Sequence, residues 1–194
     1  MTGRQLVLGS TSRYRAELLR RLDLPFETRA PGTIESVIAG ETPADRAMRL
    51  AAAKAVDAGT EYLDALVIGS DQVAELDGVI LDKPGTWERA HAQLSACSGR
   101  TVHFHTALCL LDTRTGRPHT HIDLTRAHFR TLEAAEITRY IEREQPLDCA
   151  GSFKCEGLGI SLFERIENSD PTALIGLPLI ALARLLRDAG VDVP

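Results

Sequence analysis

The chain has 194 residues, of which 44% are hydrophobic and 25% charged, and its formal net charge is −5 at pH 7. This size and composition suit one globular domain over residues 1–194, which a cleft could divide into two lobes, and they exclude disordered and fibrous classes. The acidic balance argues against a protein that coats nucleic acid, and no stretch approaches the roughly 18 to 20 apolar residues of a membrane helix.

Short strands alternate with helices in the first 70 residues. Apolar runs that end at turn-forming residues predict strands, and leucines or alanines at helical spacing predict helices. Thr42 and Pro43 are typical of a helix start, with threonine as the cap and proline in the first turn. The expected elements are a strand at 5–8, a helix at 15–24, a strand at 25–30, a helix at 43–58 and a strand at 66–68.

The rest of the chain combines hairpins with further helices. Asp77-Gly78 is a favoured two-residue turn, and it predicts a hairpin over 73–81. Alternating residues predict a second antiparallel pair at 101–111 and 121–130. The remaining expected elements are helices at 86–97, 133–143 and 178–188 and a strand at 158–165. This mixture of βα units and hairpins predicts an α/β fold with a mixed, strongly twisted sheet and flanking helices.

Polar groups gather directly after two of the expected strands. Residues 9–15 read Gly-Ser-Thr-Ser-Arg-Tyr-Arg, and residues 69–72 read Gly-Ser-Asp-Gln. Open α/β sheets bind their ligands at strand tips, where loops carry phosphate-binding and acid or base groups. The pairing of these two stretches therefore indicates a nucleotide hydrolase.

Three lysines are candidates for binding an anionic ligand. Lys54 is alone in an otherwise apolar helical stretch. Burying an unpaired charge is costly, so either its stem reaches water or its ammonium meets an anion in a cleft. Lys83 and Lys154 raise the same question, and each alone would suit an ordinary surface position. Together with Arg13 and Arg15 they supply enough positive charge for a triphosphate, provided that the fold brings them together.

Two carboxylates supply the other half of the site. Asp71 directly follows a predicted strand, and a general base needs such a fixed position. Glu35 lies in a loop of turn-forming composition, where a solvated acid is the ordinary alternative. Glu35 and Asp71 could share a hard divalent cation, Mg²⁺ or Mn²⁺, with the bound phosphates, because such ions prefer oxygen ligands.

With these residues in place, the chain resembles the Maf-like nucleoside triphosphate pyrophosphatases, which implies a Maf/ITPase-like fold with a central cleft. The matches cover nearly the whole chain: residues 6–12, Arg15, Leu18-Leu19, Leu50-Ala51, Lys54-Ala55, Gly69-Ser70-Asp71, Lys83-Pro84, Leu94-Ser95 and Ser98-Gly99. Through residues 69–73 and 149–157 it is similar to the YceF-like branch, which acts on 7-methyl-GTP.

The resemblance implies hydrolysis of a nucleoside triphosphate to the monophosphate and pyrophosphate. It makes Asp71 the base that activates water. It places the phosphates on Ser12, Arg15, Lys54 and Lys83. Glu35 matches the family's loop glutamate, although Ile34 stands where an aspartate often precedes it. Electrostatic stabilisation is commonly the largest part of such catalysis, so the lysines should affect rate as well as affinity.

A base preference can be argued from charge. Methylation at N7 makes guanine cationic, which favours an aromatic face and a carboxylate opposite the N1 and N2 hydrogens. Tyr14, where the family branch has tryptophan, and Glu156 suit these two roles. Gln72 could add an amide hydrogen bond, and Lys154 lies in the same segment as Glu156.

Three alternatives remain open. The dTTP- and UTP-preferring branches of the family usually have threonine at the position of Gln72 and arginine at that of Tyr14. Alternating histidines could instead ligate the metal of a phosphoesterase; these are His103, His105, His119 and His121. The third alternative is a regulator that binds nucleotides without cleaving them.

The cellular setting follows from the cysteines and the N-terminus. Four cysteines without C-x-x-C spacing predict reduced thiols, and residues 1–10 lack the layout of a secretion signal, so a cytoplasmic protein is expected. The expected partner is a small-molecule nucleotide, not a nucleic acid or a membrane. The family resemblance also suggests a homodimer, for which residues 101–130 could supply a surface.

Overall fold

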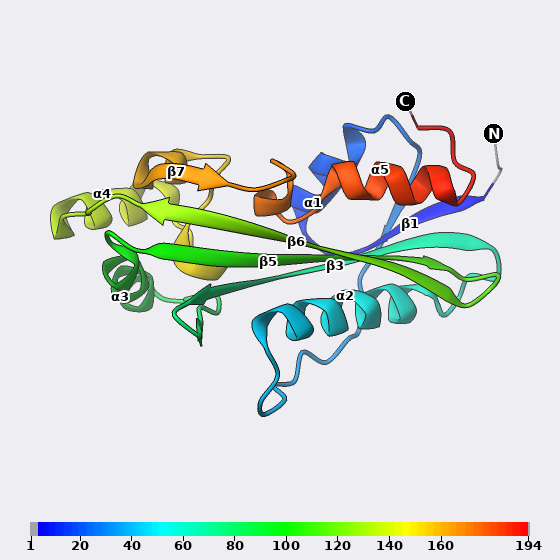
Figure 1. Cartoon of the computed structure of the whole chain (residues 1–194), viewed down its shortest axis with the longest axis horizontal. Helices are drawn as coiled ribbons and strands as arrows, with labels where there is room; N and C mark the ends of the chain where they lie inside the picture. Colours follow the sequence, from blue (N-terminus) through cyan, green and yellow to red (C-terminus); the bar gives the residue numbers. More distant parts are fainter. Residues whose placement is uncertain (1–3, 194) are drawn as a thin grey trace.

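The computed structural model describes residues 4–193, and its strands form one mixed sheet. The sheet order is β2-β1-β3-β5-β6-β7, with β4 paired to β3. The strands are β1 (Gln5–Gly9), β2 (Glu27–Arg29), β3 (Ala65–Leu76), β4 (Val79–Ile80), β5 (Thr101–Asp112), β6 (Arg117–Phe129) and β7 (Phe163–Glu167). β1 is parallel to β2 and β3, whereas the other pairs are antiparallel. The predicted α/β class with a mixed, twisted sheet is confirmed (Figure 1).

Helices cover both faces of the sheet (Figure 1). The α-helices are α1 (Arg13–Arg20), α2 (Pro43–Gly59), α3 (Trp87–Cys97), α4 (Ala134–Glu144) and α5 (Leu179–Asp188), and short 3-10 turns are η1 (Ala150–Ser152), η2 (Leu158–Leu162) and η3 (Ala173–Ile175). Helices α1 and α5 pack against one face of β1, β3 and β5, and α2 packs against the other. Helices α3 and α4 enclose a third cluster at the far end of β3, β5 and β6. None of the helices in the described part is long and apolar enough to cross a membrane.

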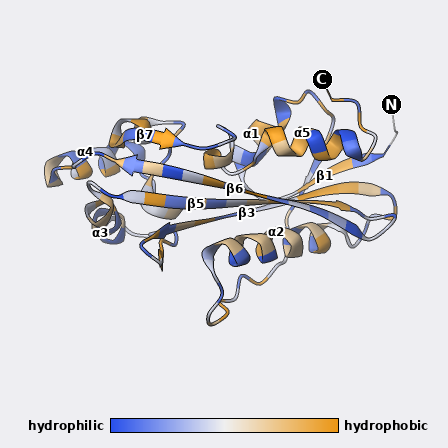
Figure 2. Ribbon diagram, in the orientation of Figure 1, coloured by the Kyte–Doolittle hydropathy of each residue, from blue (hydrophilic) through white to orange (hydrophobic). Residues whose placement is uncertain are grey.

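Hydropathy follows this layering. In Figure 2, β1 is largely apolar, whereas α2 and α5 alternate apolar and polar residues. The buried residues of α2 recur at helical spacing and face the sheet, namely Ala47, Leu50, Ala51, Lys54, Ala55 and Ala58. Lys54 is thus a charged side chain on the buried stripe of its helix, and the site must supply its partner.

Three predicted elements differ from the structure. The expected strand at 66–68 is the start of the twelve-residue β3, which runs without a break into the hairpin. The first helix, expected at 15–24, starts at Arg13 because Ser12 caps it, and it ends at Arg20. Residues 158–162 form a 3-10 turn rather than a strand. At Gly159 a Cβ would lie 2.3 Å from the carbonyl oxygen of Lys154, so this segment packs directly on neighbouring backbone.

The cleft arises from unequal strand lengths. β1 pairs with β3 only as far as Gly69, and β4 begins to pair at Glu75. Between these two residues this edge of β3 has no neighbouring strand, and the largely buried residues Asp71, Gln72, Val73 and Ala74 line a cavity there. Gly69 also lets α2 approach closely, because a Cβ at this position would lie 2.2 Å from the carbonyl oxygen of Ala51. The glycine therefore fixes α2 directly beside the start of the open edge.

Candidate active site

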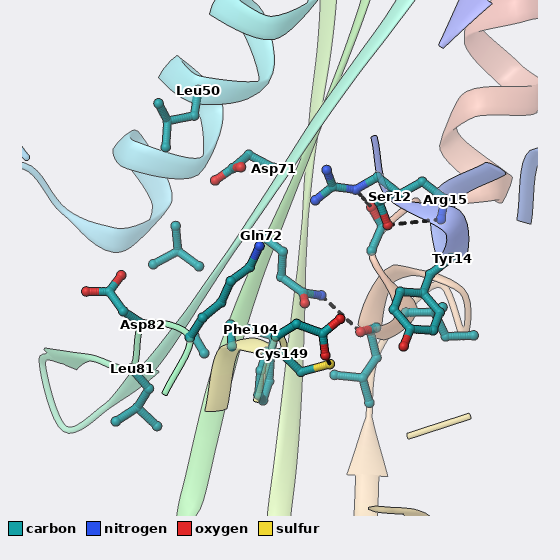
Figure 3. A pocket seen from close by; sticks show the side chains of 18 of the residues that line it. Ser12, Tyr14, Arg15, Leu50, Asp71, Gln72, Leu81, Asp82, Phe104 and Cys149 are labelled. Carbon is teal, nitrogen blue, oxygen red and sulfur yellow. Dashed lines mark hydrogen bonds between the residues drawn. The ribbon is translucent and has the colours of Figure 1, made fainter. Parts of the chain in front are cut away.

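A cavity of about 370 Å³ opens at the uncovered edge of β3 (Figure 3). A second hollow of about 600 Å³ adjoins it. The two share seven lining residues: Ser12, Tyr14, Arg15, Glu35, Lys54, Lys83 and Asp148. Asp71 and Gln72 project from neighbouring positions of β3 and line the first hollow (Figure 3). Most of the residues that the sequence singled out thus surround one continuous space.

Lys54 joins the two candidate catalytic carboxylates. Its Nζ lies 2.6 Å from Oδ1 of Asp71 and 2.6 Å from Oε1 of Glu35. The side chains of Lys54 and Asp71 are each 10% exposed, whereas that of Glu35 is 53% exposed. The ammonium therefore meets anions in a cleft, which was one of the two outcomes expected for a lysine on an apolar stripe.

The two carboxyl groups respond differently to this shared cation. Burial raises the pKa of Asp71 above its ordinary value, and the opposing charges of Lys54 and Arg15 do not cancel that effect. Burial also acts to raise the pKa of Glu35, but the hydrogen bond and charge of Lys54, helped by Lys83, leave it lowered. The site thus shifts the two pKa values in opposite directions, upward for Asp71 and downward for Glu35, which is a pattern seen where two carboxyl groups have different roles.

Arg15 is held at the cavity wall by backbone and hydroxyl oxygens. Its Nε donates to the carbonyl oxygen of Gly176 at 3.0 Å, and its Nη1 lies 3.5 Å from Oγ of Ser10. Burial lowers the pKa of the guanidinium, against the attraction of Asp71 and Glu35. An arginine keeps its charge in proteins, so Arg15 presents a buried cation to an anionic ligand.

Ser12 caps the helix that carries Arg15. Its Oγ accepts the backbone N–H of Arg15 at 3.4 Å, and its side chain lines both hollows. A helix N-terminus offers backbone donors and a favourable dipole to an anion. Ser12 and Arg15 therefore bring two kinds of donor to the same wall.

Lys83 and Lys154 have different positions. Lys83 lines both hollows, and its charge acts on Glu35. Lys154 does not line the cavity. Its Nζ donates to the carbonyl oxygen of Glu144 at 2.9 Å and lies 3.4 Å from that of Gln145, at the C-terminal end of α4. The expectation that Lys154 contacts the substrate is corrected accordingly, because a cation at a helix C-terminus serves the helix.

The first cavity also contains the residues expected to contact a base. Tyr14 and Glu156 both line it, as do the apolar side chains of Phe104 and Leu174. The guanidinium of Arg13 stacks over the Tyr14 ring at 4.8 Å and donates to its hydroxyl at 2.7 Å. One face of the ring is therefore already covered by a cation.

Gln72 is tied to the protein through its amide nitrogen. Nε2 lies 3.0 Å from Oγ1 of Thr106, 3.1 Å from the carbonyl oxygen of Ala173 and 3.0 Å from that of Leu174. These contacts use its donors to hold η3 against the sheet. Oε1 is the amide atom left to meet a ligand, so Gln72 can accept but not donate there.

The histidines do not converge. Nδ1 of His103 and Nε2 of His105 lie 3.6 and 3.5 Å from Oε2 of Glu75, on the face of the sheet that α2 covers. His119 and His121 pair with Leu110 and Leu108, whose side chains belong to the opposite face. Within residues 4–193, no group of three or more His, Cys, Asp or Glu side chains is placed to hold a metal ion. The histidine-ligated alternative therefore has no geometric support.

Sequence reasoning missed several residues that line the cavity. They are Arg46, Leu50, Asp82, Phe104, Asp148 and Cys149. Arg46 could have been found, because it precedes Leu50 and Lys54 at intervals of four residues and so shares their helical stripe. Leu50 lies on that stripe too. The other four residues reach the cavity only through the pairing of β3 with β5 and through loops, which leave no local signal in the sequence.

Comparison with known proteins gives consistent matches over nearly the full length. The family model described as "Maf-like protein" matches residues 5–189. A Xanthomonas oryzae protein named 7-methyl-GTP pyrophosphatase is 57% identical over 190 residues, which are 98% of this chain and 99% of that protein. Proteins of the same name from Thiobacillus denitrificans and Cupriavidus metallidurans are 55% and 56% identical, covering 99% and 95% of this chain and 96% and 93% of their own lengths.

Proposed function

This chain belongs to the Maf-like protein family, and on that basis we propose that it hydrolyses 7-methyl-GTP to 7-methyl-GMP and pyrophosphate and thereby clears modified nucleotides. One observation carries the proposal. The buried carboxylate of Asp71 shares a cavity with the cations of Arg15, Lys54 and Lys83. A base beside concentrated positive charge is what water attack on a polyphosphate needs.

The reaction follows from the positions of these groups. Asp71 removes a proton from a water molecule, and the resulting hydroxide forms a bond to the α-phosphorus. The bond between this phosphorus and the bridging oxygen to the β-phosphorus breaks, and pyrophosphate leaves with that electron pair. Negative charge spreads over the phosphoryl oxygens during the transfer, where Lys54, Lys83 and Arg15 stabilise it.

A methylated guanine suits Tyr14, Gln72 and Glu156, which line the same cavity. Its delocalised positive charge is attracted to the carboxylate of Glu156 and to the free face of the Tyr14 ring. Cation–π attraction contributes about 0.5 to 2 kcal/mol. Oε1 of Gln72 can accept a hydrogen bond from the base, since Nε2 is committed to η3.

A substrate screen tests the proposal. The value of kcat/KM for 7-methyl-GTP is expected to exceed those for GTP, dTTP and UTP by at least about tenfold. The bases of these three nucleotides are uncharged and cannot make the charged contacts that the methylated base makes. Pyrophosphate and nucleoside monophosphate release should be measured together. Glu156→Gln should reduce the preference, whereas Glu164→Gln, an exposed carboxylate on β7, serves as the matched control.

Each other outcome of the screen favours a different reading. Faster turnover of dTTP or UTP would assign the chain to the pyrimidine-preferring type of Maf enzyme. Binding without release of pyrophosphate would leave a nucleotide-binding regulator.

We also propose that a divalent cation, Mg²⁺ or Mn²⁺, assists this reaction. The carboxylates of Glu35 and Asp71 suit such an ion, because each contacts the Lys54 ammonium through one oxygen, at 2.6 Å, and has a second oxygen that could serve as a ligand. Mg²⁺ is usually held by one or two carboxylates together with substrate phosphates, so two protein ligands suffice. When bound, the ion would polarise a phosphoryl oxygen.

Removal of the metal should therefore suppress turnover. After chelation and removal of the chelator, kcat/KM is expected to fall by at least about tenfold and to recover on addition of millimolar Mg²⁺ or Mn²⁺. Metal content should be measured in the same samples. Undiminished turnover in the presence of chelator would contradict the cation, and tightly held zinc would instead favour a histidine site.

The setting of the enzyme completes the proposal. All four cysteines are free thiols, which suits the reducing cytoplasm. The substrate is a small nucleotide, and the net charge of −5 gives no general attraction for nucleic acid. A homodimer would use the β5 and β6 hairpin, where the large apolar side chain of Ile122 is exposed.

A further inference from the structure

Arg46 is a largely buried cation in the cavity whose Nε has no hydrogen-bond partner among the described residues and whose ion pair with Asp82 is long. It lies in the first turn of α2 and lines the first hollow together with Leu50 and Lys54. These three residues follow one another at intervals of four, so they form a single stripe along the helix. With a rise of 1.5 Å per residue, Arg46 and Lys54 are about 12 Å apart along the axis.

The hydrogen-bonding capacity of Arg46 is largely unused. Its side chain is 12% exposed, and its Nε is buried without a hydrogen-bond partner among the described residues. Nη2 lies 3.5 Å from Oδ1 of Asp82, a long contact to a carboxylate that is 63% exposed. The nearby carboxylate of Glu41 is committed to Arg49, at 2.5 and 2.7 Å. A buried donor without a partner is unfavourable, so a ligand oxygen at this point would be stabilising.

Helix stability does not account for the residue either. The helix is capped by Thr42, with Asp45 in its first turn, and both suit the positive end of the helix dipole. A cation one residue later opposes that dipole. Arg46 therefore adds an unfavourable charge to the end of a helix, beside a cavity that already holds Lys54 and Lys83. A polyanion bound in the cavity would attract Arg46 and turn this unfavourable charge into a favourable one.

We propose that Arg46 binds the phosphate chain of the substrate through its guanidinium, at the part that leaves as pyrophosphate. Lys54 and Lys83 hold the chain near Asp71, and Arg46 extends the same row of cations along α2. The planar fork of a guanidinium matches phosphate oxygens, which a lysine at this place would not. Arg46 is then a determinant of phosphate number, and this assignment rests on the proposed function of the cavity.

Binding of inorganic triphosphate tests Arg46 without the base. Calorimetry with inorganic triphosphate is expected to show a Kd about 10- to 100-fold higher for Arg46→Gln than for the unaltered enzyme, the loss of a hydrogen bond between charged groups. With 7-methyl-GTP, KM should rise by a similar factor, with kcat changed less. Arg89→Gln, which removes an exposed arginine of α3 outside the cavity, is the charge-matched control and should leave both values within about twofold.

The variants separate a binding role from a structural one. Unchanged triphosphate affinity in a folded Arg46→Gln protein would overturn the assignment and leave Arg46 as a support of the Asp82 segment. If that variant does not fold, Arg46→Lys keeps the charge but loses the fork, and triphosphate affinity equal to that of the unaltered enzyme would equally contradict the assignment. Arg46-dependent triphosphate binding by an enzyme that fails to turn over 7-methyl-GTP would refute the proposed substrate and leave the role of Arg46 intact.

Discussion

Replacement of Asp71 by asparagine is expected to lower kcat by about 10²- to 10⁴-fold, the range typical for loss of a positioned general base. The amide keeps the shape of the side chain and can still contact Lys54, but it cannot take a proton from water. Lys54 retains Glu35 as a partner at 2.6 Å. The fold should therefore persist, and steady-state assays of pyrophosphate release together with circular dichroism measure both effects. Near-normal turnover in the folded variant would show that Asp71 is not the base.

The pH dependence of the unaltered enzyme gives a second measure of the same group. Because burial raises the pKa of Asp71 in the folded state, kcat/KM should fall with decreasing pH already above the ordinary range of an aspartate. The folded state also binds this proton more tightly than the unfolded state, so the contribution of Asp71 to stability is present at low pH. That contribution is lost as pH rises from the unfolded to the folded pKa. The pH dependence of the unfolding free energy that Asp71 causes should therefore be absent in the Asp71→Asn variant.

Replacement of Lys54 by methionine is expected to lower kcat/KM by about 10²- to 10³-fold, as loss of a preorganised donor to a developing oxyanion does. Methionine preserves most of the apolar stem on the buried stripe of α2. The variant also leaves the carboxylates of Asp71 and Glu35 without their shared cation. Steady-state kinetics and thermal unfolding at several pH values measure these two consequences.

The activity and the stability of the methionine variant should each depend on pH. Lys54 acts to lower the pKa of Asp71, so without it that pKa rises further and the acid limb of the residual activity moves to higher pH. The loss of unfolding free energy in the methionine variant, relative to the unaltered enzyme, should be smallest at low pH, because protonated Asp71 needs no cationic partner. Lys54→Arg keeps the charge and is the control for it. An acid limb that stays in place in the methionine variant would contradict the coupling of Lys54 to Asp71.

Local sequence was sufficient for most secondary-structure elements, because their signals are local. The predicted caps at Thr42 and Thr86 each accept a backbone N–H at the start of a helix, as threonine side chains commonly do. The Asp77-Gly78 turn closes the hairpin between β3 and β4. The extent of β3 could not be predicted in this way, since residues 69–72 are polar or small and contact partners far along the chain.

The residues of the candidate site also differ in whether local sequence singles them out. Lys54 could be singled out because a charge on an apolar helical stripe is anomalous in the sequence itself. Lys154 shows no comparable local signal, and its ammonium contacts the carbonyl oxygens of Glu144 and Gln145 at the end of α4, across the turn that separates the two segments. Likewise Gln72 has a suitable amide, but η3 packs on the same face of the sheet and uses its donors.

The sequence by itself determined the chemical types at the site: a carboxylate after a strand, a cation on an apolar helical stripe, and small polar residues after the first strand. These follow from spacing within single elements. Only the tertiary structure decided which of them meet. β1 stops at Gly9 while β3 continues to Leu76, and Gly69 allows α2 to lie against the open edge. Such contacts depend on strand lengths and close packing between distant segments, and those interactions are not encoded in any local pattern.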